Sequence, residues 1–396
     1  MLRGAEKVNN ALLQISAVAY GGEAVGKLPS GKVCFVPGGL PGEELEVEIV
    51  QEKSSFARAR LLKVVKSSPE RIEAACRFFR DADCPGCAYL HCPYPLELEF
   101  KQAQLADFLI RSNLLGDGEL LEPFASPQRE FYRNKLKLRS DGSTFAMVAR
   151  DNESLIRIDR CILADHPIND AIRNTPVPPA GTNICWRSTR HDGVRSYSGK
   201  NCPRNTEWLS EFLEDAGIFK VPQDGFFQTN PQVAAELVRR VTALISGTGL
   251  SRLVELYCGV GVFSIAAAGA VPELTSVGIE LNPAAIRAAR WNAHRHGVDK
   301  RCRFVAGDAG KELKKLGDIS GCCLLVDPPR SGITASTLND IIAADPEKII
   351  YISCAADTLR RDLELFRRAG WLIESAGLLD MFPGTAHFET LVSLVR

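Results

Sequence analysis

The repeated alternation of continuous apolar runs with helical stretches, from residue 223 to the end, constrains the fold more than any other feature. Runs such as RLVELYC, CCLLVD and KIIYISC lack the polar alternation of a half-exposed strand, and a stretch with helical spacing follows each. Strands that are apolar throughout are buried on both faces, which requires helices on each side of a mostly parallel sheet. The sequence therefore predicts an α/β, doubly wound sheet over residues 223–396. Asn230 and Pro231 mark the start of its first helix, and Gly247 marks the end.

The first part of the chain has a different rhythm. Between residues 14 and 65, short β-rich runs are separated by glycine turns at Gly21-Gly22, Gly31 and Gly38-Gly39. This spacing predicts a small antiparallel barrel. It looks like a TRAM domain, an OB-like barrel that binds RNA, although a barrel with no nucleic-acid role fits the strand pattern equally well.

Composition narrows the setting. The chain has 396 residues, 45% of them hydrophobic, which is ordinary for a globular protein. The opening MLRGAEKVNN lacks the profile of a signal peptide, and no window approaches the roughly 18 apolar residues of a membrane span. We therefore expect a cytoplasmic protein with no membrane partner, in which the 13 cysteines are thiols, metal ligands or catalysts. Because the net charge is zero, any contact with RNA must come from local basic patches.

One such patch is expected in the middle of the chain. The stretch FYRNKLKLRS places Arg133, Lys135, Lys137 and Arg139 at a period of two, so a strand would carry all four cations on one face. Like charges on one face repel unless they meet an anion such as phosphate. The pattern favours a strand that faces RNA, and a solvated face is the alternative.

The stretch ELYCGVGVFSIAAA predicts where a cofactor binds. It lies at the first strand-to-helix turn, where Gly259 and Gly261 let a ligand approach the backbone, and Glu280 ends the next strand, where a carboxylate can hold a ribose diol. A dinucleotide-binding turn would place a third glycine near Ser264, which follows the bulky Phe263. The features favour S-adenosyl-L-methionine, which carries no phosphate, over NAD.

Three further motifs fall at the same edge of the predicted sheet: DPPRSG from Asp327, YISC ending at Cys354, and HFET containing Glu389. Arg330 stands where methyltransferases of exocyclic amines commonly have an aromatic residue, which argues against an amine acceptor. Carbon 5 of uracil is a poor nucleophile until a thiolate adds to carbon 6, and a base must later remove the proton from carbon 5. Cys354 and Glu389 could fill these two roles, and a helix starting at residue 356 or 357 is expected to lower the pKa of the thiol.

Cys354 taken alone has a simpler interpretation. Free cysteine is among the most buried residue types, and CCLLVD shows that this chain uses cysteine in its core. A single glutamate at the start of a strand is likewise usually solvated.

The motifs taken together resemble the RNA 5-methyluridine methyltransferase family, which acts on ribosomal RNA and tRNA. They occur in family order behind the barrel, and the resemblance covers nearly the whole chain. They are FFQTN (226–230), ELYCGVG (255–261), DPPRSG (327–332), YISCAADTL (351–359) and HFETLVSL (387–394).

The resemblance assigns roles to individual residues. It implies Cys354 as the nucleophile and Glu389 as the proton acceptor. It also implies four residues lining the S-adenosyl-L-methionine site: Gln228, Tyr257, Glu280 and Asp327. The chain departs from the family pattern at two places, since Ala355-Ala356 replaces the usual Asn-Pro and Glu255 replaces the usual aspartate. The first departure puts the identity of the substrate in question.

The resemblance also extends to a cysteine cluster. Cys76, Cys84, Cys87 and the distant Cys161 resemble the [4Fe-4S] ligands of the family's cluster-bearing members. Four thiolates at this spacing would suit tetrahedral zinc as well. The interval between Cys76 and Cys84 is longer than the family pattern, and Cys92 is an alternative ligand. A cluster here would be a structural staple, since the methyl chemistry needs no electron transfer.

We therefore predict three parts: a TRAM-like RNA-binding barrel (1–66), a central β-rich domain with the cysteine cluster and a helix over 96–115 (67–222), and a class I methyltransferase domain (223–396). The expected partner is RNA. The first expected substrate is 23S ribosomal RNA, and the alternative is uridine 54 of tRNA. The protein is expected to be a monomer by default. A radical S-adenosylmethionine protein is disfavoured because the Cys-x3-Cys-x2-Cys triplet is absent. A non-catalytic RNA-binding or assembly protein is the other alternative.

Overall fold

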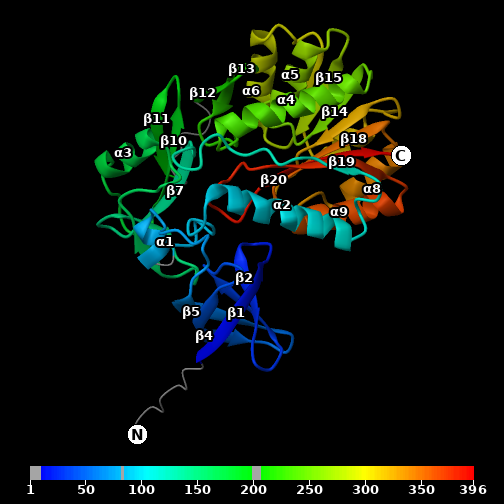
Figure 1. The fold of residues 1–396 in the computed structure, drawn as a ribbon. Helices are drawn as coiled ribbons and strands as arrows, with labels where there is room; N and C mark the ends of the chain where they lie inside the picture. The colour runs from blue at the N-terminus through cyan, green and yellow to red at the C-terminus, as the bar shows by residue number, and fades with distance from the viewer. Residues whose placement is uncertain (1–9, 82–83, 199–206) are drawn as a thin grey trace. The chain divides into compact units, whose positions relative to one another are not determined.

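The computed structural model describes residues 10–81, 84–198 and 207–396, and its contacts divide the chain into two compact units. The first unit comprises residues 1–104, 148–156 and 384–386, and the second comprises residues 105–147, 157–383 and 387–396. The chain's path through both is shown in Figure 1. The domain boundaries expected at residues 66 and 222 stay predictions.

The barrel predicted at the start of the chain is present. Its order is β1-β2-β3-β5-β4, with parallel pairing only between β3 and β5. The glycine turns at Gly21-Gly22 and Gly31 have positive φ angles, which suits residues without a Cβ. The strands are β1 (Asn10–Val18), β2 (Glu23–Lys27), β3 (Val33–Pro37), β4 (Glu44–Glu52) and β5 (Phe56–Lys66). Alternate residues of these strands, among them Leu13, Val36 and Val47, form its core.

Helices α1 (Arg77–Asp81) and α2 (Tyr94–Arg111) follow the barrel. In the part of α2 that belongs to the first unit, Lys101 and Glu97 form a fully buried ion pair of 2.8 Å. Glu97 also accepts a hydrogen bond of 2.6 Å from the backbone N–H of Gly384. A buried charge must be paired, so these contacts fix the 384–386 segment, which precedes Glu389 in the chain.

The middle of the chain forms a five-stranded sheet of order β11-β10-β7-β8-β9 and a two-stranded ribbon, β12-β13. A short strand, β6 (Glu119–Leu120), and a helix, α3 (His166–Asn174), accompany them. The strands are β7 (Lys135–Ser140), β8 (Phe145–Val148), β9 (Leu155–Arg157), β10 (Asn183–Thr189), β11 (Gly193–Ser198), β12 (Trp208–Leu213) and β13 (Gly217–Pro222).

The predicted basic strand is β7. Leu136 and Leu138 are buried, so Lys135, Lys137 and Arg139 alternate with them on the other face as expected, whereas Arg133 lies before the strand. Lys137 is exposed. Lys135, however, is half-buried and donates a hydrogen bond of 3.1 Å to the carbonyl of Gly225. Burial lowers the pKa of its ammonium group. Lys135 therefore makes a contact within the protein and is not free to bind RNA. Lys137 and Arg139, on the same face of β7, remain candidate RNA contacts.

The last part of the chain is the predicted doubly wound sheet (Figure 1). Its order is β16-β15-β14-β17-β18-β20-β19-β6; β14 to β18 are parallel, and β20 is antiparallel to both of its neighbours. The strands are β14 (Arg252–Leu256), β15 (Thr275–Glu280), β16 (Cys302–Ala306), β17 (Cys323–Val326), β18 (Lys348–Ser353), β19 (Leu372–Leu379) and β20 (Glu389–Val395).

Helices cover both faces of this sheet, with α4, α5 and α6 on one side and α8 and α9 on the other (Figure 1). They are α4 (Pro231–Gly247), α5 (Val262–Ala270), α6 (Pro283–Arg295), α7 (Ala309–Lys314), α8 (Ala335–Ala344) and α9 (Ala356–Arg368). Asn230 caps α4, accepting a hydrogen bond from the N–H of Val233, as the sequence predicts. None of the helices in the described ranges combines the length and hydrophobicity needed to cross a bilayer.

Candidate active site

The turn after β14 is built for close approach by a ligand. Tyr257, Gly259 and Gly261 all have left-handed φ angles, of 64°, 53° and 82°. This conformation is strained for tyrosine, and such strain is typical of functional sites. A Cβ at Gly261 would lie 2.7 Å from Cζ of Phe304, so packing requires glycine there. A Cβ at Gly259 would meet no atom within 4 Å, so this glycine instead leaves the turn open.

Glu280 is held beside that turn. It ends β15, and its Oε1 accepts a hydrogen bond of 2.8 Å from the N–H of Asn282. Its Oε2 accepts one of 3.3 Å from the N–H of Gly259. The carboxylate is thus fixed next to the glycine turn, as a ribose-binding group requires.

A small cavity of about 50 Å³ adjoins the turn. Gln228, Tyr257 and Asp327 all line it, so the fold brings together three of the four residues expected at the cofactor site. Glu280 does not line the cavity itself, but it holds Gly259, which does. The residues suit a ligand that presents both polar and apolar groups.

Glu255 also lines this cavity and was expected only as a departure from the family pattern. Its Oε2 accepts hydrogen bonds from the backbone N–H, at 3.0 Å, and the hydroxyl of Ser264. Its Oε1 is buried without a hydrogen-bond partner among the described residues. Burial raises the pKa of Glu255 to about 8, and the carboxylates of Asp327 and Glu280 act in the same direction. The side chain is therefore protonated at neutral pH.

This raised pKa predicts how stability depends on pH. The folded state keeps the Glu255 proton to about pH 8, whereas the ordinary value is 4.5. The stability that this group contributes is complete below about 4.5 and is lost as the pH rises through 8, with a limiting slope of about 1.4 kcal/mol per pH unit. Glu255→Gln is expected to make the fall of the unfolding free energy between these values shallower in urea titrations, while Asp327, whose pKa burial raises to about 7, still contributes to it. If the slope of the unfolding free energy against pH is the same in Glu255→Gln as in the unaltered protein, the raised pKa of Glu255 is contradicted. Glu273 is an exposed glutamate, and Glu273→Gln is the control.

Cys354 lies directly after β18 and before α9, which begins at Ala356 without a side-chain cap. The thiol is half-buried. The expectation of a lowered pKa is wrong: burial, followed by the carboxylate of Glu389, raises the pKa of Cys354 to about 11. The guanidinium of Arg330 opposes this shift through its charge and a hydrogen bond. In the free protein the group is a thiol.

The sheet register brings Glu389 next to Cys354. Strand β20 runs antiparallel to β18, and Ser353 pairs with Thr390. Continuing that register places Cys354 opposite Glu389, and directly opposite residues have Cβ atoms about 4.5–5.5 Å apart. Glu389 is buried, with 3% of its surface exposed. Burial and the carboxylate of Asp327 raise its pKa well above the ordinary value.

Arg330 is the site residue that the sequence analysis did not assign. It belongs to the DPPR motif after β17, and its charge acts on both Cys354 and Glu389. The signal was visible as an arginine where amine methyltransferases have an aromatic residue. A cation near a thiol and a carboxyl group stabilises the ionised form of each.

The two phenylalanines of FFQTN separate clearly. Phe227 is in the core, with the Arg187 guanidinium 5.8 Å above its ring centroid, whereas Phe226 is 70% exposed. Beside them, the carbonyl of Gln228 accepts a hydrogen bond of 3.4 Å from Asn134. Of the two, only Phe226 offers an open ring face next to the site.

The predicted metal ligands lie in both units. Cys76, Cys84 and Cys87 belong to the first unit and Cys161 to the second. Across residues 10–81, 84–198 and 207–396, no group of three or more His, Cys, Asp or Glu side chains is arranged to hold a metal ion. Cys92, the alternative ligand, is buried and directs its thiol to the carbonyl of Tyr89 at 3.2 Å. The four-cysteine ligand set stays a prediction.

Comparison with known proteins identifies a family and a shared fold. Residues 198–396 match the model of the tRNA (uracil-5-)-methyltransferase family, and residues 12–62 match the TRAM domain. An uncharacterized RNA methyltransferase of Thermotoga maritima is 27% identical, covering 97% of this chain and 98% of its own. One of Thermosynechococcus vestitus is 28% identical over 96% of this chain and 97% of its own. The structure of a Pyrococcus abyssi tRNA (uracil-54, C5)-methyltransferase, solved with S-adenosyl-L-homocysteine, is 24% identical with a TM-score of 0.73, covering 96% and 99% of the two chains.

Proposed function

The chain belongs to the tRNA (uracil-5-)-methyltransferase family, and from this premise we propose that it methylates carbon 5 of a uridine in RNA through Cys354 and Glu389. The observation that carries these assignments is the strand register, which sets Cys354 opposite Glu389 at the edge where Gln228, Tyr257 and Asp327 line the small cavity. S-adenosyl-L-methionine is the methyl donor of this chemistry.

In the proposed reaction Cys354 acts first. Its sulfur adds to carbon 6 of the uracil ring, which makes carbon 5 nucleophilic. Bound S-adenosyl-L-methionine supplies an electrophilic methyl group to that carbon. Because the thiol pKa is about 11 in the free protein, ionisation must be assisted when the substrate binds, and Arg330 is the cation beside the sulfur that favours the thiolate.

Glu389 acts second. After methyl transfer, carbon 5 carries both the methyl group and its original proton, and Cys354 cannot leave until that proton is removed. Burial makes Glu389 a stronger base than an exposed glutamate once it has ionised. Arg330 limits the cost of that ionisation, so one cation serves both the thiolate and the carboxylate.

The target base must leave its stack to reach a thiol at the end of a strand. Phe226, exposed beside Gln228, supplies a ring on which a base can stack. The remaining cofactor contacts are proposed for Glu280 at the ribose and for Gln228, Tyr257 and Asp327 around the methionine part.

Ribosomal RNA is the first proposed substrate, and tRNA is the second. The TRAM-like barrel and the predicted cluster favour ribosomal RNA through the family resemblance. The Pyrococcus abyssi relative, which acts on uracil 54 of tRNA, supports the alternative. The test is nucleoside mass analysis of purified ribosomal RNA and of tRNA after incubation with the protein and labelled S-adenosyl-L-methionine. New 5-methyluridine in one pool assigns the substrate, and none in either contradicts the proposed function.

A [4Fe-4S] cluster held by Cys76, Cys84, Cys87 and Cys161 is proposed as a structural group, with zinc as the alternative. Cys84 and Cys87 flank a two-residue Pro-Gly turn, which suits ligands of one metal centre. Metal and sulfide analysis of protein purified without oxygen separates the two proposals. Iron together with sulfide supports the cluster, and zinc alone supports the alternative. If the protein contains neither metal, both proposals are overturned.

A further inference from the structure

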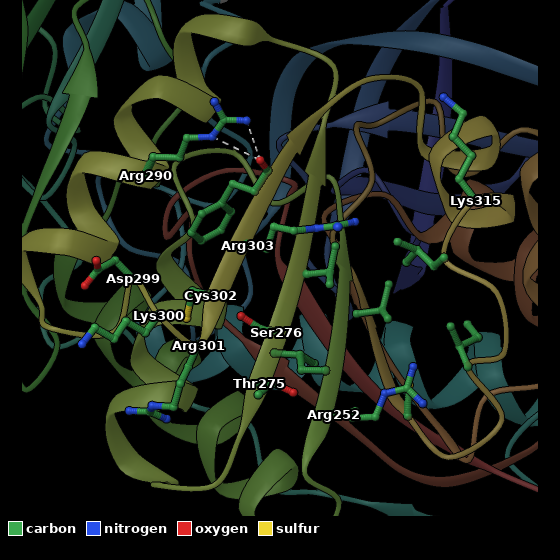
Figure 2. A pocket seen from close by; sticks show the side chains of 17 residues that line it. Arg252, Thr275, Ser276, Arg290, Asp299, Lys300, Arg301, Cys302, Arg303 and Lys315 are labelled. Atoms are coloured by element: carbon green, nitrogen blue, oxygen red, sulfur yellow. Dashed lines mark hydrogen bonds between the residues drawn. The ribbon is translucent and has the colours of Figure 1, made fainter.

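A second and larger cavity lies at the edge of the methyltransferase sheet where the strands begin, and Cys354 follows the opposite end of β18. It encloses about 850 Å³ around the first residues of β14, β15 and β16 (Figure 2). The register sets Val254 beside Val277 and Val277 beside Arg303, so these side chains share one face of the sheet. We call this cavity the amino-edge groove.

The amino-edge groove is strongly basic. Of the residues that line the groove, only Asp299 is acidic, whereas several elements contribute lysine and arginine side chains to its lining (Figure 2). The whole chain has a net charge of zero, so this is a local excess. The cations are Arg252, Arg290, Lys300, Arg301, Arg303 and Lys315.

Several of these guanidinium groups are held in place without being neutralised. Arg290 donates a hydrogen bond of 2.7 Å to the carbonyl of Phe304, as the dashed lines of Figure 2 show. Arg301 donates to the carbonyls of Val271 and Leu274, both at 3.1 Å. A carbonyl fixes an arginine but carries no net charge, and a guanidinium has five N–H donors. Donors and charge therefore remain for a further anion.

Two carboxylates offset part of this charge. Lys315 pairs with Glu312 at 2.7 Å, and Arg252, which donates to the carbonyl of Asp318, adds through its charge to the hydrogen bonds that lower the pKa of that residue's carboxyl group. No ion pair is found in the described part of the chain for Arg290, Lys300, Arg301 or Arg303. Arg303 and Lys300 are both exposed. Closely spaced cations without ion-pair partners repel one another, and a bound polyanion reduces that repulsion. The cations in turn replace the counterions of the polyanion, which are released into solution and favour binding.

We propose that the amino-edge groove binds backbone phosphates of the substrate RNA outside the nucleotide that is methylated. The identity of the ligand rests on the proposed function. A five-residue strand such as β14 spans about 16 Å, so an RNA at both edges must extend several nucleotides beyond its target or fold around the domain. The groove would thus favour long, structured RNA over short oligonucleotides. Arginine matches phosphate geometry with two parallel N–H donors.

The test reverses the charge of two exposed groove residues with Lys300→Glu and Arg303→Glu together. The affinity for purified ribosomal RNA is measured by fluorescence anisotropy over a range of salt concentrations. We expect Kd to rise about tenfold or more, and the slope of log Kd against log salt to become shallower by about 1.5 because two phosphate contacts are lost. Methyl transfer to a short oligouridylate should keep its rate.

A matched double variant, Arg287→Glu with Arg368→Glu, changes the net charge equally at exposed helix positions outside the groove. It should bind ribosomal RNA like the unaltered protein. The neutral pair Lys300→Gln and Arg303→Gln should give a smaller loss in the same direction, and thermal melting verifies that each variant folds.

The outcomes separate this proposal from the proposed function. If ribosomal RNA binds both double variants equally well, the groove is not an RNA site, whether or not the protein methylates uridine. If only the Lys300→Glu, Arg303→Glu variant binds ribosomal RNA more weakly and with a shallower salt dependence, the groove is a site for RNA phosphates. That conclusion holds even when no methyl transfer is found. Loss of binding to polyglutamate with unchanged RNA binding would overturn the proposal in favour of an acidic protein segment.

Discussion

Replacing Cys354 with alanine is expected to lower methyl transfer to RNA by roughly 10⁴-fold or more, because removing a covalent nucleophile removes the reaction path itself. Binding of S-adenosyl-L-methionine should change little, since Cys354 does not line the small cavity beside the glycine turn. The rate is measured as labelled methyl groups transferred to ribosomal RNA and to tRNA. Cofactor affinity is measured by calorimetry on the same preparation.

A matched cysteine distinguishes catalysis from packing. Cys323 is fully buried at the amino end of β17 and lines neither cavity, and Cys323→Ala is expected to cost stability while leaving the methylation rate within about threefold of the unaltered protein. If the two variants lose activity equally, or if Cys354→Ala stays active, Cys354 is part of the core and not the nucleophile.

Replacing Glu389 with glutamine is expected to stop the reaction at a later step. The thiol of Cys354 can still add and the methyl group can still be transferred, but the proton on carbon 5 then has no acceptor. Release of methylated RNA should slow by about 10²–10⁴-fold. A methylated RNA that stays attached to the protein should accumulate, visible as a slowly migrating band on denaturing gels.

The same variant makes a second, independent measurement informative. The Glu389 carboxylate raises the thiol pKa of Cys354, and Arg330 lowers it. Glu389→Gln should therefore speed alkylation of Cys354 by iodoacetamide at a fixed alkaline pH, and Arg330→Met should slow it. Glu364→Gln, on the outer part of α9, is the control for both assays. Release of free RNA at the normal rate by Glu389→Gln would contradict its role as the base.

Much of the fold could be predicted because its determinants are local in sequence. Continuous apolar runs mark parallel strands, and Asn230 with Pro231 marks the start of α4, so period and capping suffice. The barrel followed from the three glycine turns, each of which contains a glycine with a positive φ angle. The parallel pairing of β3 with β5 could not be predicted, because strand spacing does not specify which strands close a barrel.

The site was predictable only in part, because its chemistry depends on distances between segments. The edge of the sheet followed from the strand ends, but the state of Cys354 did not. A helix start suggested a lowered pKa, whereas burial and the opposite carboxylate of Glu389 raise it. Arg330 and Lys135 illustrate the same limit. The charge of Arg330 acts on both Cys354 and Glu389, and Lys135 donates a hydrogen bond to the carbonyl of Gly225.

The central claim is that Cys354 forms a covalent bond to carbon 6 of a uridine whose carbon 5 receives the methyl group. The most direct test incubates the protein with labelled S-adenosyl-L-methionine and RNA containing 5-fluorouridine, because fluorine at carbon 5 cannot leave as a proton does. The account predicts a stable adduct of protein and methylated RNA, attached at Cys354 by mass analysis and absent in Cys354→Ala. Equal behaviour of the two proteins, or an adduct at another residue, would contradict it.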